Sequence, residues 1–181
     1  MDELRARLEA YVGKPMAPPA VAPDAVNLPM IRHWVDALDD RNPVYLDEEF
    51  AATSRFGGIV APPAMLQTWT MARPRIEGIA ERGGAPNKIS SDNPIAVLAA
   101  AGYVGTVATN SELEFVRYLR PGDQLHLTIE LESISDRKTT ALGQGYFVTW
   151  VTTYMDGEDE VVGRQLFRVL KFDPSTIGAT A

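Results

Sequence analysis

One short segment carries most of the groups in this chain that could do acid–base chemistry. It runs Asp39-Asp40-Arg41-Asn42-Pro43-Val44-Tyr45-Leu46-Asp47, directly after an apolar helical stripe. A carboxylate such as Asp40 can accept a proton or orient a water molecule, and Tyr45 can donate a hydrogen bond. Tyrosine is a poor base at neutral pH because its reference pKa is about 10. Asp40 is also explained as a turn residue that binds backbone donors beside Asn42 and Pro43, and both interpretations stay open at this stage.

Composition excludes several other kinds of chemistry. The 181 residues include no cysteine and only two histidines. A thiolate nucleophile, a disulfide and a Cys-ligated metal are therefore impossible, as is a three-histidine metal site within one chain. His33 falls on a predicted helix and His126 on the polar face of a predicted strand, and we interpret both as surface residues. We expect no metal and no redox cofactor.

Charge and hydropathy narrow the partners and the location. The formal charge of −7 repels nucleic-acid phosphates, so the sequence predicts no nucleic-acid partner. No apolar run approaches the roughly 20 residues that a membrane span needs, and the acidic N-terminus is unlike a signal peptide. We therefore expect a cytoplasmic protein, of a length that suits one domain.

Helices are predicted in the first part of the chain, where they place the Asp40 segment. Apolar residues at helical spacing predict helices over 2–12 and 30–38, the second ending at the Asp40 segment. Residues 14–29 are rich in proline and alanine, which favours an extended crossing segment. The run 61–71 starts with two prolines and continues apolar, which predicts a buried helix.

A sheet is predicted in the second part. Residues 73–94 are interpreted as a surface flap with a short helix near 76–81, and 95–101 as a buried strand or a helical turn. We hypothesise that a flap within residues 73–101 opens or caps a ligand-binding tunnel. From residue 104 onward the alternation of apolar and polar residues predicts four antiparallel strands. Helices followed by strands indicate an α+β fold with helices on one sheet face.

Further candidate binding groups lie on the predicted strands. Arg117 and Arg120 bracket a strand end, where they could meet an anionic ligand, although each also fits a solvated surface charge. The aromatic residues Tyr146, Trp150 and Tyr154 share one strand face, and we interpret them as packing or interface residues rather than a ligand platform.

The sequence around Asp40 resembles the MaoC-like, or (R)-specific enoyl-CoA hydratase, family of hot-dog-fold proteins. The signature of that family is a small residue, then Asp, any residue, Asn-Pro, an aliphatic residue and His, which 40–44 match. The runs 56–62 and 121–123 also resemble the family. The resemblance covers about 14–172 and implies a single hot-dog domain, in which a curved antiparallel sheet wraps a long central helix. A helix at 1–13 would precede this domain, and a loose tail at 173–181 would follow it.

Two departures from the signature shape the activity that the resemblance implies. Tyr45 stands where the family has its catalytic His, and Asp39 stands where glycine is usual. In active members Asp and His together activate the water that adds across the enoyl double bond. The chain is therefore most similar to the His-lacking, substrate-binding subunits of heteromeric hydratases, such as the hydratase of cholesterol side-chain degradation. The resemblance implies a partner hot-dog subunit that carries Asp and His, in a heterodimer or heterotetramer.

The implied substrate is a bulky 2-enoyl-CoA, with a steroid side-chain or long-chain acyl group, and coenzyme A enters only as part of that thioester. Asp40 occupies the catalytic position of the family. It would not act in catalysis if Tyr45 cannot replace the His. Backbone N–H groups after Pro62-Pro63 would hold the thioester oxygen. Alternatives are a self-sufficient homodimeric hydratase that uses Asp40, a non-catalytic acyl-CoA-binding module, and a thioesterase. The candidate substrate-binding residues are Asn42, Tyr45, Ala64, Met65, Arg117 and Arg120.

Overall fold

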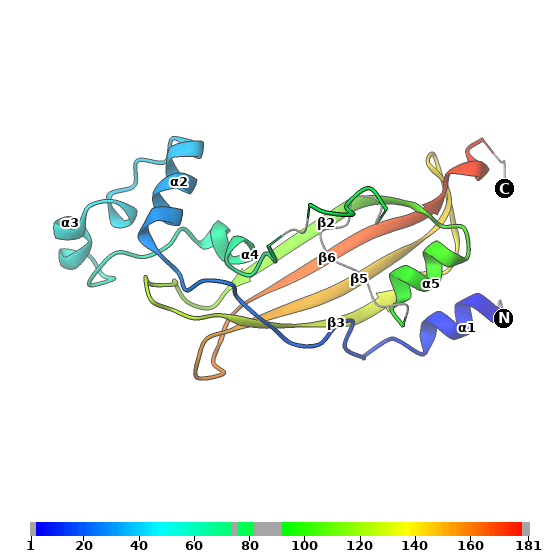
Figure 1. Cartoon of the computed structure of the whole chain (residues 1–181), viewed down its shortest axis with the longest axis horizontal. Coiled ribbons are helices and arrows are strands. Elements are labelled where there is room, and N and C mark those ends of the chain that lie inside the picture. Colours follow the sequence, from blue (N-terminus) through cyan, green and yellow to red (C-terminus); the bar gives the residue numbers. More distant parts are fainter. Residues whose placement is uncertain (1–2, 74–75, 82–91, 179–181) are drawn as a thin grey trace.

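An antiparallel sheet with short helices on one of its faces organises the chain (Figure 1). The computed structural model describes residues 3–73, 76–81 and 92–178. The strand order is β1-β3-β5-β6-β2, with β4 paired beside β5. In chain order the strands are β1 (Ala20–Val21), β2 (Gly105–Phe115), β3 (His126–Ile134), β4 (Lys138–Thr140), β5 (Gly143–Met155) and β6 (Val161–Asp173). The four predicted strands are confirmed, and two short strands join them.

Strands β5 and β6, each 13 residues long, form the centre of the sheet. Their register places Tyr146 opposite Lys171, Trp150 opposite Phe167 and Tyr154 opposite Gly163. Residues paired in this way point to the same face of a sheet. This face packs against the helices, and we call it the inner face.

Asparagine and aspartate residues set the starts of several helices. The side chains of Asn27, Asp47 and Asn93 each accept a hydrogen bond from a backbone N–H in the first turn that follows. The α-helices are α1 (Glu3–Glu9), α2 (Leu28–Leu38), α3 (Glu48–Thr53), α4 (Leu66–Trp69) and α5 (Pro94–Ala100). The 3-10 helices are η1 (Pro43–Tyr45), η2 (Pro63–Met65) and η3 (Pro174–Thr176), the last lying in the expected C-terminal tail.

The expected long helix along the sheet is divided in this chain. Helix α4 ends at Trp69, and α5 begins only at Pro94, so residues 95–101 are mainly helical rather than a strand. A four-residue helix gains little from its own hydrogen bonds and depends on the burial of Leu66 and Trp69. The short helix expected near 76–81 is a series of turns, and the rest of the expected flap, 82–91, lies outside the described residues.

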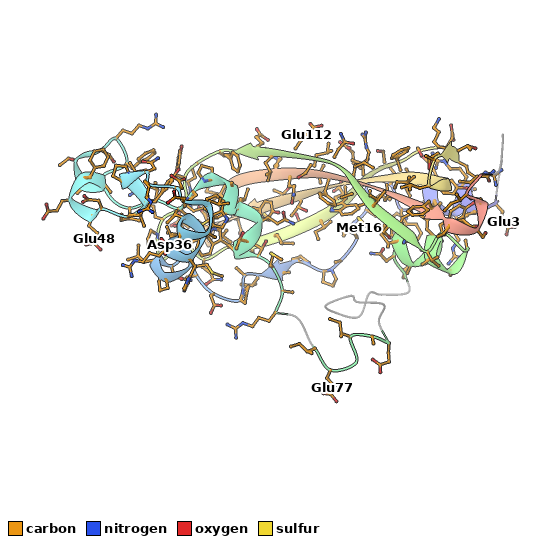
Figure 2. All side chains as sticks on the ribbon, turned by 90° about the horizontal axis from the view of Figure 1, so that it is seen from above. Glu3, Met16, Asp36, Glu48, Glu77 and Glu112 are labelled. Atoms are coloured by element: carbon orange, nitrogen blue, oxygen red, sulfur yellow. The ribbon has the colours of Figure 1, made fainter. Side chains whose placement is uncertain are left out.

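Two apolar clusters fill the space between the helices and the inner face. The first joins α2, η1 and η2 to one end of the sheet, around Tyr45, Met65 and Tyr154. The second joins α1 and α5 to the other end, around Leu8 and Leu98. In Figure 2, Glu112 of β2 and Glu77 lie on opposite sides of the strands, with α5 on the side of Glu77. Within the described ranges, no helix is long and apolar enough to cross a membrane.

Lys171 is an exception on the inner face, because it is a charged residue with only 4% of its surface exposed. Its ammonium group donates to the Thr106 hydroxyl at 2.7 Å and to the Val104 carbonyl at 3.3 Å. Burial lowers the pKa of Lys171 from the ordinary value of 10.5. The folded state therefore carries a cost for keeping this group charged.

We expect Lys171→Met to raise the free energy of unfolding at neutral pH by about 1 kcal/mol, because methionine fills similar space without a charge to desolvate. The pKa of Lys171 is lower in the folded chain than the 10.5 of the unfolded chain. The free energy of unfolding of the wild-type chain therefore rises as the pH increases from the folded-state pKa of Lys171 toward 10.5. The stability advantage of the variant shrinks over the same pH range. Urea unfolding at about pH 7 and about pH 10 measures both effects. The exposed Lys138→Met is the control, and an advantage that does not change with pH would contradict the expectation.

Candidate functional site

The Asp40 segment begins where α2 ends. Asp39 has a left-handed backbone conformation with a φ of 51°, which glycine, asparagine and aspartate adopt most readily. The departure from glycine at this position is therefore compatible with the turn. The Asp40 N–H donates to the Val35 carbonyl at 2.9 Å, and the Asp39 carboxylate lies 2.6 Å from the Arg41 guanidinium. The end of α2 thus determines where Asp40 lies.

Asp40 is half-buried and takes part in the turn that leads into η1. Its Oδ1 accepts a hydrogen bond from the Asn42 N–H at 3.0 Å, and Asn42 Oδ1 accepts one from the Val44 N–H at 3.3 Å. The predicted turn is confirmed, and its geometry includes the backbone bond expected of a turn aspartate. Asn42 itself is exposed, with its side-chain oxygen used as the cap of η1.

Tyr45 is 8% exposed and packs in the first apolar cluster. Burial raises the pKa of its hydroxyl, and the nearby Tyr118 and Asp40 raise it further, while a hydrogen bond with Asn42 acts in the opposite direction. The hydroxyl therefore stays protonated at neutral pH. It can donate a hydrogen bond, but it cannot take the proton-accepting role of the imidazole that the family signature has at this place.

The start of the divided helix lies beside this segment. The Val60 N–H donates to the Val44 carbonyl at 3.3 Å, which ties the two stretches together. The Met65 N–H donates to the Pro62 carbonyl at 3.0 Å, so the expectation that it is available to a ligand is wrong. Ala64 is exposed, and its N–H has no hydrogen-bond acceptor among the described residues. Of the two predicted donors, Ala64 alone can meet a ligand oxygen.

Arg117 is occupied by contacts within the chain. Its guanidinium donates to the carboxylates of Asp123 and Asp156, each at 2.7 Å, and so joins two turns at one end of the sheet. Burial alone would lower the pKa of Arg117, but these two hydrogen bonds outweigh it and the pKa is raised. The hydrogen bond from Arg117 also lowers the pKa of Asp156. This network holds the turns in place.

Arg120 is also engaged within the chain, because its guanidinium donates to the Phe56 carbonyl. This bond uses one of the five N–H donors of the guanidinium, so a ligand role for Arg120 stays a prediction. The two histidines are peripheral: His33 is exposed on α2, and His126 Nε2 lies 3.0 Å from the Asp159 carboxylate. In the described part of the chain, no group of three or more His, Asp or Glu side chains could hold a metal ion.

A cavity of about 670 Å³ lies beside the start of α5. Its walls come from the extended segment 15–19, the start of α5 and the inner face of the sheet, and Met16 marks this place in Figure 2. A second cavity, of about 220 Å³, lies next to α4 and shares Ile129 and Trp150 with the first. Pockets that bury drug-sized ligands usually have volumes of about 300–1,000 Å³ and mostly apolar walls.

Two of the three aromatic residues line a cavity. Tyr146 and Tyr154 are buried in the two clusters, as predicted, but Tyr154 also lines the smaller cavity, and Trp150 lines both. Sequence reasoning missed the cavity role of residues 15–19, although an apolar, proline-rich stretch held extended across a sheet is a suitable wall. It also missed Gln165. The sequence signal for this residue is that it is polar but stands at a position of β6 whose side chain faces the inner face of the sheet.

The fold and the Asp40 turn define a class, the MaoC-like hot-dog proteins, and solved MaoC-like dehydratases and (R)-hydratases share this fold at lower sequence identity. Residues 12–165 match the family described as FAS1-like, dehydratase domain region. The chain belongs to this family. The predicted α+β hot-dog fold and the MaoC-like resemblance are therefore confirmed.

Two curated relatives are named as hydratase subunits. The "probable enoyl-CoA hydratase alpha subunit" of Thermomonospora curvata is 45% identical over 175 residues, which are 96% of this chain and 53% of that protein. The "3-oxo-4,17-pregnadiene-20-carboxyl-CoA hydratase alpha subunit" of Mycobacterium tuberculosis is 44% identical over 158 residues, which are 87% of this chain and 48% of that protein. The chain thus spans about half the length of these relatives.

A solved structure is similar over nearly the whole chain. One chain in the crystal structure of the ChsH1–ChsH2 complex from Mycobacterium tuberculosis is 38% identical, with a TM-score of 0.79, and the match covers 95% of this chain and 92% of that one.

We expect Arg117→Leu to lower the free energy of unfolding at neutral pH by about 1–2 kcal/mol, because two carboxylates lose their donor while remaining partly exposed. The folded-state pKa of Asp156 is below 3.8, so the stabilisation is complete above that pH and is lost as the pH falls through the folded pKa. Urea unfolding at about pH 7 and about pH 3 should therefore show a difference that shrinks in acid.

Arg164→Leu is the matched control, because its ion pair with Glu114 is more exposed and longer, at 3.3 Å. A surface pair of this kind contributes little to stability. If Arg117→Leu instead lost acyl-CoA binding with unchanged stability, the structural role of Arg117 would be wrong.

Proposed function

We propose that this chain is the substrate-binding, non-catalytic subunit of a heteromeric enoyl-CoA hydratase that acts on bulky 2-enoyl-CoA thioesters. The observation that carries the proposal is Tyr45, whose raised pKa keeps it protonated where the family has its His. Hydration needs a group that takes a proton from water and one that delivers a proton to the α-carbon. A partner hot-dog subunit with Asp and His would supply both groups.

In this reaction the water oxygen bonds to C3 and a proton to C2, which gives a 3-hydroxyacyl-CoA. Our proposal gives this chain the task of holding the thioester. The Ala64 N–H faces no protein acceptor and suits a thioester oxygen. Asp40 and Asn42 shape the turn beside it through their backbone hydrogen bonds. The proposed reaction uses no metal and no redox cofactor, and coenzyme A enters as part of the substrate.

The larger cavity supports a bulky acyl group. It has a volume of about 670 Å³ and lies between the extended segment 15–19, the start of α5 and the inner face of the sheet. The name of the Mycobacterium tuberculosis relative specifies a polycyclic pregnadiene acyl group. We therefore propose a steroid side-chain or long-chain acyl group as the occupant of the cavity.

The partner is proposed to add at the edge strand β2. This strand pairs with β6 on one side, and all of its residues after Gly105 are exposed. An outer edge along a strand of 11 residues is unusually long, since soluble proteins normally shorten or shield such strands. Leu113, Phe115 and the following Val116 add exposed apolar side chains at its end. Strand addition by a second hot-dog sheet would cover both features.

We expect the chain alone to show no hydration of enoyl-CoA and the mixture with its partner subunit to be active. Asp40→Asn in this chain should change kcat of the mixture less than about twofold, because the carboxylate serves the turn, whereas Asp→Asn in the partner should abolish turnover. The assay follows loss of the enoyl-thioester absorbance. Activity of the chain alone that Asp40→Asn abolishes would favour a homodimeric hydratase. Binding without turnover in the mixture would favour a binding module, and thiol release would favour a thioesterase.

We expect Leu113→Asp combined with Phe115→Asp to prevent co-purification of the partner, because both changes place charge at the proposed junction. Both side chains are at least 40% exposed, so the melting temperature of the chain should change little. Leu142→Asp is the matched control, since Leu142 is similarly exposed at 41% in the turn between β4 and β5. Retention of the partner by the double variant would exclude this edge as the junction.

A further inference from the structure

The smaller cavity, next to α4, has an unusual lining for a space between a helix and an apolar sheet face. Its apolar lining residues are Met71, Leu127, Ile129, Trp150 and Phe167. Amide and hydroxyl side chains also line it: Gln67, Thr70, Thr152, Tyr154 and Gln165. Ligand pockets typically combine such apolar walls with a few polar groups that fix the orientation of the ligand.

Gln165 is held in one orientation inside this cavity, although only 4% of its surface is exposed. The Tyr154 hydroxyl donates to its Oε1 at 2.9 Å, and its Nε2 donates to the Ser111 hydroxyl at 3.0 Å. Burial raises the pKa of Tyr154 to about 12, so this hydroxyl keeps its proton and remains a donor at physiological pH. The three side chains come from β2, β5 and β6, which makes the amide part of the sheet rather than of a movable loop.

Hydrogen-bonding capacity remains unused at this place. An amide oxygen accepts two hydrogen bonds, and Gln165 Oε1 receives one from Tyr154. The contact from Gln165 Nε2 to Gln67 Oε1 is 3.4 Å, longer than an ordinary N–H···O bond. Thr152, which is 5% exposed, also lines this cavity. Buried polar groups are unfavourable unless bonded, so the incompletely bonded amide of Gln165 suits a polar guest.

The position of these polar residues relates them to the proposed acyl group. Gln67 follows Ala64 by three residues, so it lies about one helical turn beyond the proposed thioester donor. Ile129 and Trp150 line both this cavity and the larger one beside the start of α5. An acyl group held at Ala64 and extended toward the larger cavity would therefore come near Gln67 and Gln165.

We infer that Gln67 and Gln165 form a polar subsite for a ketone or hydroxyl oxygen carried on the apolar frame of the acyl group. This inference rests on the proposed function and narrows its substrate class from bulky acyl-CoA thioesters to those with an oxygen beyond the thioester. Amide groups suit either oxygen, because the NH₂ donates to a ketone or hydroxyl and the carbonyl accepts from a hydroxyl.

The test uses two probes with one ring skeleton, pregnane-20-carboxyl-CoA and its 3-oxo derivative, in titration calorimetry with the full chain in the assembly in which it is purified. We expect the oxo probe to bind about tenfold more tightly, which is the ratio that one ordinary hydrogen bond gives. Gln165→Leu and Gln67→Leu should each reduce this ratio to less than about threefold without weakening binding of the probe that lacks the ketone.

Gln144→Leu is the matched control, because Gln144 lies on β5 and lines neither cavity. Gln67 is exposed on α4, so its variant should fold even if Gln165→Leu does not. Equal binding of both probes by the wild-type chain would overturn the subsite and leave the proposed function standing. Binding of neither probe would overturn the steroid acyl group of the proposed function and the subsite together. If Gln144→Leu also abolished the difference in affinity between the two probes, that result would contradict the subsite.

Discussion

The structure depends on how the inner face of the sheet is kept from water. Strands β5 and β6 present large side chains on this face, and a single sheet layer cannot bury them without a second layer. Among the described residues, α1 and α5 pack on one end of this face and α2, η1 and η2 on the other, while the extended segment 15–19 lines a cavity against it. Both cavities lie against this same face, so one surface serves stability and the proposed ligand binding.

Local sequence signals predicted the turn at Asp40 and the strands well. Asn42, Asp47 and Asn93 act through bonds to residues two or three positions away, which a sequence window contains. The strand alternation is similarly local, and it placed Tyr146, Trp150 and Tyr154 on one face. The hot-dog fold followed from the resemblance because the order of helices and strands already agreed with it.

Features that depend on distant residues were not predictable in the same way. The apolar run 61–71 has the composition of a longer helix, but α4 ends where burial of its side chains ends, at Trp69. Arg117 and Arg120 looked like ligand-binding cations, yet their partners lie at other turns, as far away in sequence as Asp156 and Phe56. The role of Gln165 was not predicted because its hydrogen-bond partners, Tyr154 and Ser111, come from two other strands.

The long outer edge of β2 has a consequence for how the cell makes this protein. Outward-facing N–H and C=O groups along a strand of 11 residues form a template on which an extended chain can assemble. If the proposed partner covers this edge, molecules produced in excess of that partner would be exposed to aggregation and proteolysis. Matched synthesis with the proposed partner would then matter more for the yield of the protein than the stability of its core.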